Sequence, residues 1–297
     1  MALTTEQKND LMKVISQTGG TREVNLKTLV IPDSYKAYMD QCTREEITLS
    51  FPGLDPLRVV VTRPRERRPG MPLHVNFHGG GFIFRQNGDD DMYCAHLSAG
   101  ANAVVVDVDY AVCPDAVFPM AVEQSWEAVK WAYDHCAEWG CDPDRFSIGG
   151  SSAGGNLALT VALRNKGQVP ICLLVLEYAA SDLNQAVNDP LQARSDAFSR
   201  LYADGDIEKL KDPMLSPVYA TDEQLRAFPE TLIIGPKRCP FYTHNNRLGM
   251  RLVELGVKVT FHSFPEGAHG FTIRMVGNDW LESQNDVIRA IKEAAKK

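Results

Sequence analysis

The sequence has no long apolar run, no charged leader before an apolar segment and no excess of basic residues. Its apolar stretches stay below the roughly 18 residues of a membrane-spanning helix, and residues 1–13 are polar and amphipathic. The formal net charge is −7 and the sequence pI is about 5.5, which is the wrong sign for displacing counterions from nucleic acid. We therefore expect no membrane span, no secretory signal and no nucleic-acid partner.

Paired cysteine spacings are also missing. The seven cysteines are odd in number and scattered, so they do not predict the disulfide framework of a small secreted protein. Cys136 and Cys141 lack the second cysteine pair or the histidines that a zinc site requires, so we expect no metal. Free cysteines are typical of a reducing compartment, and the sequence therefore predicts a cytoplasmic protein.

Short apolar runs alternate with longer amphipathic segments through most of the chain. The runs predict strands at 73–77, 104–108, 145–149, 172–176, 231–234 and 257–261. Their nearly continuous apolar character is typical of parallel strands that are covered on both faces. The amphipathic segments predict helices at 121–136, 153–165, 245–255 and 278–295. This alternation indicates an α/β fold with a mostly parallel, doubly wound sheet flanked by helices.

Two regions interrupt this alternation. Residues 1 to about 45 are expected to be helical without strands, and residues from about 183 to 225 form a polar helical insertion. We expect both to form a helical cap over the carboxyl ends of the strands, where open α/β sheets bind ligands, within a single domain of 297 residues. Tyr35, Tyr38 and Met39 then either line the pocket or pack the first helices onto the core.

The segment Gly150-Ser151-Ser152-Ala153-Gly154 lies where a predicted strand becomes a predicted helix. In this G-x-S-x-G pattern the two outer glycines remove the side chains that would clash in a very tight turn. The helix that begins behind the serine favours negative charge at its N-terminus. The pattern therefore predicts Ser152 as a nucleophile.

Two further segments bear on the same chemistry. His78-Gly79-Gly80-Gly81-Phe82 directly follows the strand predicted at 73–77, and its glycines free backbone N–H groups to approach an oxyanion. The N–H of Ala153, just after the nucleophile, is a further donor. His269 follows the last predicted strand, where a histidine takes the serine proton and returns it to the leaving group.

Together these segments resemble the hormone-sensitive lipase-like esterases. The resemblance spans roughly residues 50–295. Beyond the elbow, the glycine loop and His269-Gly270-Phe271, it is carried by Asp109-Tyr110, Phe118-Pro119 and Asp142-Pro143-Asp144-Arg145.

The resemblance implies an α/β-hydrolase fold, a cap built from the N-terminus and the insertion, and hydrolysis of carboxylesters by a Ser-His-Asp triad. It also implies Gly80, Gly81 and Ala153 as oxyanion donors and no cofactor. The expected substrate is a small ester, with a short acyl chain, and the expected assembly is compatible with a homodimer.

One position departs from the family pattern. The catalytic acid is expected just after the strand predicted at 231–234, in a turn that resembles Asp-Pro-Leu. This chain instead has Gly235-Pro236-Lys237-Arg238-Cys239-Pro240-Phe241, with Cys239 in place of the aspartate. In a serine protease the loss of this acid lowers turnover by about 10⁴, which is roughly 5–6 kcal/mol of barrier.

Three interpretations stay open. Asp182, after the strand predicted at 172–176, could supply the carboxylate from a neighbouring strand end. Alternatively, Cys239 accepts the N–H of His269 weakly, as a thiolate favoured by Lys237 and Arg238. In the third interpretation hydrolysis is not the main activity, and the pocket binds a ligand or catalyses an elimination or a cyclisation.

Overall fold

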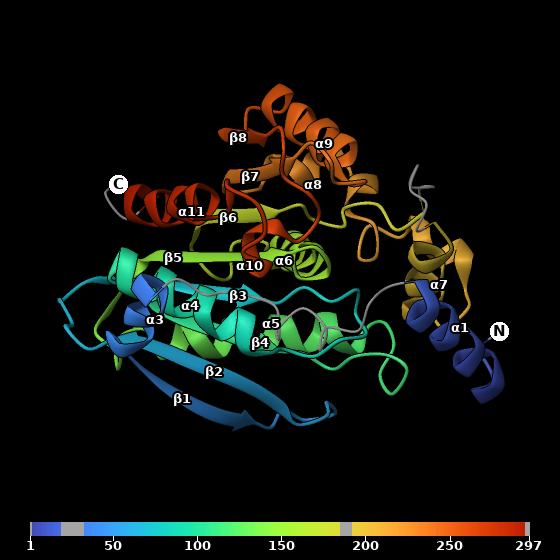
Figure 1. Ribbon diagram of the computed structural model, residues 1–297, viewed down its shortest axis with the longest axis horizontal. Helices are drawn as coiled ribbons and strands as arrows, with labels where there is room; N and C mark the ends of the chain where they lie inside the picture. The colour runs from blue at the N-terminus through green and yellow to red at the C-terminus, as the bar shows by residue number, and fades with distance from the viewer. Residues whose placement is uncertain (1, 19–32, 185–191, 295–297) are drawn as a thin grey trace.

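The computed structural model describes residues 2–18, 33–184 and 192–294. These residues form an eight-stranded sheet, which lies at the centre of the molecule (Figure 1). The strands are β1 (Cys42–Leu49), β2 (Leu57–Pro64), β3 (Met71–Phe77), β4 (Val104–Asp109), β5 (Cys141–Ser151), β6 (Ile171–Glu177), β7 (Glu230–Pro236) and β8 (Val259–Phe264). Their order is β1-β2-β4-β3-β5-β6-β7-β8. Pairing is antiparallel from β1 to β4 and parallel from β4 to β8. The predicted mostly parallel sheet is confirmed.

Helices cover both faces of this sheet. The helices are α1 (Thr5–Thr18), α3 (Asp33–Asp40), α4 (Gly88–Ala101), α5 (Met120–Asp134), α6 (Ala153–Asn165), α7 (Gln192–Tyr202), α8 (Asp222–Arg226), α9 (Tyr242–Glu254), α10 (Phe271–Arg274) and α11 (Trp280–Ala294). Two short 3₁₀ helices, η1 (Ile207–Lys211) and η2 (Pro217–Tyr219), lie between α7 and α8. The core on one face includes side chains of α5, α6 and α9, and the core on the other includes those of α4 and α11.

The central strands place alternate side chains into these two cores. Val104 and Val106 of β4 belong to the core beside α5 and α6, whereas Val105 between them belongs to the core beside α4 and α11. All three are fully buried. This arrangement explains the continuous apolar runs, because a strand that is covered on both faces has no polar side.

The elements that were not expected from the sequence pattern include β1, β2 and α4. In β1 the residues between the two ends are mostly charged or polar and largely exposed, because this strand is the edge of the sheet. It pairs along its whole length with β2, which is also missing from the expected strands. Helix α4 lies between the sheet, α3 and α11, so it is buried on more than one side and shows no simple amphipathic pattern.

The expected cap needs one correction. The helical part of the N-terminal region ends at Asp40, because residues 42–45 already belong to β1. Helix α1 packs against α7, whereas α3 packs on α4 and β1, on the other side of the molecule (Figure 1). Since α3 runs directly into the edge strand, it stays at that edge and does not join α7.

The aromatic residues of α3 follow from this position. The ring of Tyr38 lies 4.2 Å from the ring of His96 on α4, and Met39 is exposed. Neither residue lines the cavity described below. The side chain of Tyr35 lies outside the described residues. No helix in the described ranges is long and apolar enough to cross a membrane.

Candidate active site

Ser152 stands alone between the end of β5 and the start of α6. Its backbone has φ 54° and ψ −113°, a conformation that costs a non-glycine residue about 1–3 kcal/mol. Three hydrogen bonds hold it. The N–H of Ser152 donates to the carbonyl of Glu177 at 2.9 Å, and the carbonyl of Ser152 accepts from the N–H groups of Ala180 and Asn156 at 2.9 and 3.2 Å. The strained turn is therefore fastened to β6 and to the segment that follows it.

The glycines on either side of the serine are required by close backbone contacts. A Cβ on Gly150 would lie 2.5 Å from the carbonyl carbon of Gly154, and a Cβ on Gly154 would overlap the carbonyl oxygen of Phe77. Phe77 is the last residue of β3. The elbow thus touches the end of β3, and the glycine loop that begins after β3 starts beside the nucleophile.

His269 lies in the loop between β8 and α10, with its Nε2 3.0 Å from Ser152 Oγ. The imidazole ring is held edge-on by two aromatic rings, Tyr178 at 5.0 Å and Phe241 at 5.2 Å. Burial of the ring, followed in size by the positive charges of Arg274 and Arg194, lowers the pKa of His269 to about 3. The imidazole is therefore neutral near pH 7 and able to accept a proton.

The other ring nitrogen of His269 faces a thiol. Cys239 Sγ lies 3.1 Å from His269 Nδ1, and the N–H of Phe241 donates to the same sulfur at 3.3 Å. Cys239 is 5% exposed. Asp182, the other candidate, accepts the N–H of Asn184 at 3.0 Å in the turn after β6. The geometry thus brings Cys239, and not Asp182, to the nitrogen that the triad acid would bind.

The glycine loop and the nucleophile line one cavity of about 190 Å³. Gly80 and Gly81 have φ values of +133° and +63°, which favour glycine, and Ala153 is the first residue of α6. Phe198 of α7 packs on the loop, since a Cβ on Gly81 would lie 2.9 Å from its ring. Part of the expected cap therefore contacts the loop directly. No group of three or more metal-ligating side chains occurs in the described part of the chain.

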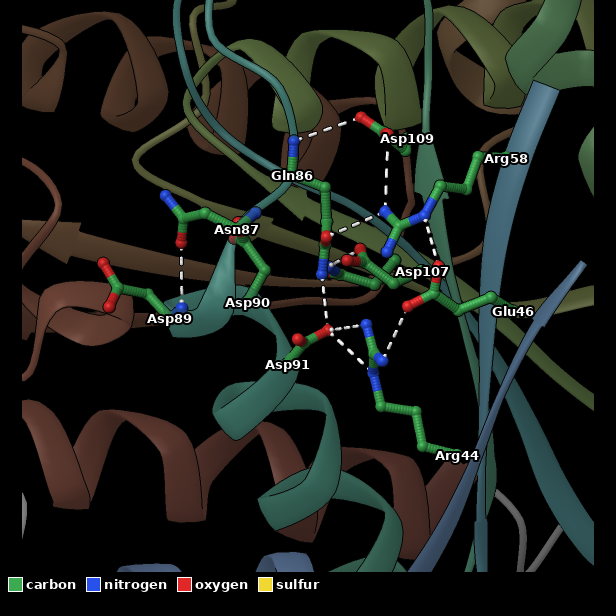
Figure 2. A network of polar contacts seen from close by, with 11 residues as sticks. Arg44, Glu46, Arg58, Gln86, Asn87, Asp89, Asp90, Asp91, Asp107 and Asp109 are labelled. Atoms are coloured by element: carbon green, nitrogen blue, oxygen red, sulfur yellow. Dashed lines mark hydrogen bonds and ion pairs between the residues drawn. The ribbon is translucent and has the colours of Figure 1, made fainter. Parts of the chain in front are cut away.

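A buried carboxylate at the end of β4 fastens both ends of the glycine loop. Asp109 accepts the N–H of Gln86 at 3.1 Å and lies 3.6 Å from His78 Nε2 and 3.4 Å from Arg58 Nη1. Burial raises the pKa of Asp109, but its contacts with His78, Gln86 and Arg85 outweigh this and hold the pKa below its ordinary value. Figure 2 shows Gln86 and Arg58 converging on Asp109 from the loop and from β2.

The outer part of this network is exposed. Arg58 also binds Glu46 at 2.9 Å, and Arg44 joins Glu46 to Asp91 (Figure 2). The sequence pattern singled out Asp109 only as part of a family motif. Its position facing the loop could not be read from sequence, because Asp109 and the loop belong to different strand ends.

Comparison with known proteins identifies the family of this chain. A family model described as alpha/beta hydrolase fold matches residues 74–273. The esterase LipI of Mycobacterium tuberculosis is 32% identical over 212 residues, which are 67% of this chain and 65% of LipI, slightly less than two thirds of that protein. Human hormone-sensitive lipase is 39% identical over 102 residues, 34% of this chain and 10% of that protein. The chain belongs to the hormone-sensitive lipase-like family of α/β-hydrolases.

The fold and the enzyme class of this hydrolase follow from the same comparisons. An esterase structure from Pyrobaculum calidifontis superposes with a TM-score of 0.82 at 27% identity, and the match covers 96% of this chain and 94% of the other. The relatives of this chain include an esterase and, at 30% identity over 76% of this chain and 75% of that protein, the carboxylesterase NlhH of Mycobacterium tuberculosis. The chain is a carboxylic ester hydrolase by family. Residues 74–273, which the family model matches, contain the serine elbow, the glycine loop and His269.

A second buried carboxyl group belongs to Glu177, whose backbone carbonyl accepts the N–H of the nucleophile. Glu177, the last residue of β6, is fully buried and accepts the hydroxyl hydrogen of Tyr93 at 2.7 Å. Burial raises the pKa of Glu177 from 4.5 to about 7. Because the folded pKa is raised, this group contributes stability that is complete below about pH 4.5 and is lost as the pH rises through about 7.

Replacing this carboxyl group tests the pH dependence. We expect Glu177→Gln to gain free energy of unfolding relative to the unchanged chain as the pH rises from about 4.5 to about 8, by up to about 3 kcal/mol. Urea denaturation across this range measures the difference, and Glu282→Gln on the exposed face of α11 is the matched control. A difference for Glu177→Gln that is flat with pH would contradict this expectation.

The Asp109 network predicts an effect on turnover. In Asp109→Asn the charge that faces His78 and Arg58 is lost, so we expect kcat for an ester substrate to fall about tenfold with little change in KM, because the loop is positioned less well in the transition state. Arg44→Met, which breaks only the outer ion pairs, is the control. Equal effects of the two variants, or a change in KM alone, would count against a positioning role for Asp109.

Proposed function

We propose that this hydrolase cleaves small carboxylesters with short acyl chains through an acyl-enzyme on Ser152. The observation that carries the proposal is the 3.0 Å contact between Ser152 Oγ and His269 Nε2, at the N-terminus of α6 and within the cavity lined by the glycine loop. A nucleophile, a neutral base and a set of backbone donors then meet around one substrate carbonyl.

In the first step Ser152 Oγ attacks the acyl carbon while His269 Nε2 takes the serine proton. The developing oxyanion is stabilised by the N–H groups of Gly80, Gly81 and Ala153, and the N-terminus of α6 favours its negative charge. The imidazolium then returns the proton to the leaving alcohol. In the second step His269 activates a water molecule, which releases the acid and regenerates Ser152.

Cys239 is proposed as the third member of the triad. For Nε2 to accept the serine proton, Nδ1 must carry a hydrogen, and Cys239 Sγ is the acceptor that faces it at 3.1 Å. A thiol orients the ring but stabilises the imidazolium less than a carboxylate does, since it carries no charge. We therefore propose a complete but weakened triad.

The size of the cavity supports a small substrate. Its volume is about 190 Å³, and the aromatic side chains that line it include Phe84 after the glycine loop, Phe198 from α7 and Phe241 before α9. Phe84 and Phe198 meet edge to face, with ring centroids 6.5 Å apart. A long acyl chain would have to displace these rings, whereas an acetyl or butyryl group would not.

The nucleophile is tested with 4-nitrophenyl acetate. We expect a rapid release of 4-nitrophenolate equal to the enzyme concentration, followed by a slower steady rate, because acylation precedes hydrolysis of the acyl-enzyme. Ser152→Ala should abolish both phases, and Ser151→Ala is the matched control for the neighbouring hydroxyl. Equal turnover of Ser152→Ala and the unchanged enzyme would refute the proposal, whereas ligand binding that survives without any turnover would favour a receptor.

The third group is tested by restoring the acid. In Cys239→Asp a carboxylate beside His269 stabilises the imidazolium, so we expect kcat/KM at neutral pH to rise at least about tenfold. The same carboxylate raises the pKa of His269 from about 3, which moves the acidic limb of the pH–rate profile to higher pH.

Asp182→Asn is the matched comparison, because Asp182 lines the same cavity. We expect it to leave kcat/KM within about twofold and the pH profile in place. A large loss of turnover in Asp182→Asn, with no response to Cys239→Asp, would assign the third position to Asp182. Failure of both variants to alter turnover would exclude both groups.

A further inference from the structure

Two arginines from separate parts of the fold line the cavity together with Ser152 and His269. Arg194 belongs to the first turn of α7, in the cap, and Arg274 is the last residue of α10. Neither is needed for the reaction described above. Cations beside a base that must become an imidazolium oppose catalysis, so their presence calls for another explanation.

The side chain of Arg274 folds back over the histidine loop. A Cβ on Gly270, the residue after His269, would lie 3.2 Å from Arg274 Nε and 3.4 Å from its Cζ. The residue is exposed, and within the described ranges no carboxylate lies within 4.0 Å of its guanidinium. This guanidinium therefore lies against Gly270, the residue that follows His269, and it is available to a ligand.

Arg194 approaches from the cap. Its Cζ lies 5.8 Å from the ring centre of Phe198, the residue that packs on Gly81. The two guanidinium groups thus reach the cavity from different sides, one from the histidine loop and the other from above the glycine loop. Guanidinium groups bind carboxylates through paired hydrogen bonds, which makes an anionic ligand the natural complement of such a pair.

Four carboxylates also line the cavity, but they are arranged differently. They are Asp89, Asp90, Asp182 and Asp196. Asp90 accepts the N–H of Asn87 at the start of α4, and Asp182 accepts the N–H of Asn184. Both guanidinium groups lower the pKa of His269, whereas none of the four carboxylates raises it. The two guanidinium groups are therefore the lining charges that act on His269.

We propose that this cavity selects esters that carry a carboxylate in their alcohol part, and that Arg194 and Arg274 bind this carboxylate. The alcohol part is favoured because Arg274 lies beside His269, which protonates the leaving oxygen. A bound carboxylate also supplies the negative charge that Cys239 does not, and so stabilises the imidazolium in the transition state. This inference rests on the proposed function, since it names the substrate class of the same site.

The test compares 4-acetoxybenzoate with 4-acetoxybenzamide, which differ in charge but little in shape. We expect kcat/KM to be at least about tenfold higher for the benzoate, and rising salt to lower this value for the benzoate alone, because exposed charges are screened. The measurement uses the unchanged enzyme, so it does not depend on the folding of any variant.

Arg274→Met should change kcat/KM for the two substrates in opposite directions. The benzoate loses a binding partner, so its kcat/KM falls at least about tenfold. The value of kcat/KM for the benzamide rises slightly, because removing a cation favours formation of the imidazolium. Arg194→Met should act in the same way, and Arg226→Met on the exposed end of α8 is the control for a simple loss of charge. If the arginines had a merely structural role, their replacement would lower kcat/KM for both substrates together.

The inference is overturned if the unchanged enzyme turns over both esters equally, or if both arginine variants keep the preference for the benzoate. In those cases the hydrolysis of 4-acetoxybenzamide, together with its loss in Ser152→Ala, would still support the proposed function. If Ser152→Ala instead retained full turnover of both esters, the proposed function itself would fail.

Discussion

The contact between the serine elbow and the end of β3 is the constraint on which the rest of the site depends. Gly154 has no room for a side chain against the backbone of Phe77, so β5 and β3 must end at the same level. The loop after β3 then starts beside Ser152. Asp109, at the end of neighbouring β4, contacts His78 and Gln86 of this loop. The strained serine is held in turn by the end of β6. Adjacent parallel strands thus build the site by ending together.

The sheet could be predicted from sequence wherever burial on both faces produces an unbroken apolar run. The six expected strands all lie within or overlap β3 to β8, and the helix expected at 153–165 has the bounds of α6. The sequence pattern did not predict elements that are buried in other ways. Edge strand β1 is exposed and charged, and α4 is buried on several sides, so neither shows the periodicity of its class. Helix α3 was placed in the cap because sequence does not reveal which neighbour a short helix will contact.

The candidate site was predictable where local motifs determine it. A tight glycine turn and a histidine after the last strand are local features, and the fold brings Ser152 and His269 within 3.0 Å. The group that orients His269 was not predictable, because Asp182 and Cys239 both follow the carboxyl ends of strands at the same edge of the sheet. Only the geometry distinguishes them, by placing the sulfur at Nδ1. The two arginines carried no signal, since they come from elements far apart in the chain and each looks like an ordinary surface residue.

The electrostatics of the site then link the orienting group to the substrate. In a Ser-His-Asp triad the protein itself carries the anion that stabilises the imidazolium. Here the side chain at Nδ1 is a cysteine, and two guanidinium groups of the cavity lower the pKa of the ring. Forming the imidazolium is therefore unfavourable until an anion enters. A substrate carboxylate interacts with the guanidinium groups in the ground state, and with the imidazolium only as the serine proton moves. The second attraction exists only in the transition state, so selectivity for such substrates belongs partly to kcat and not to binding alone.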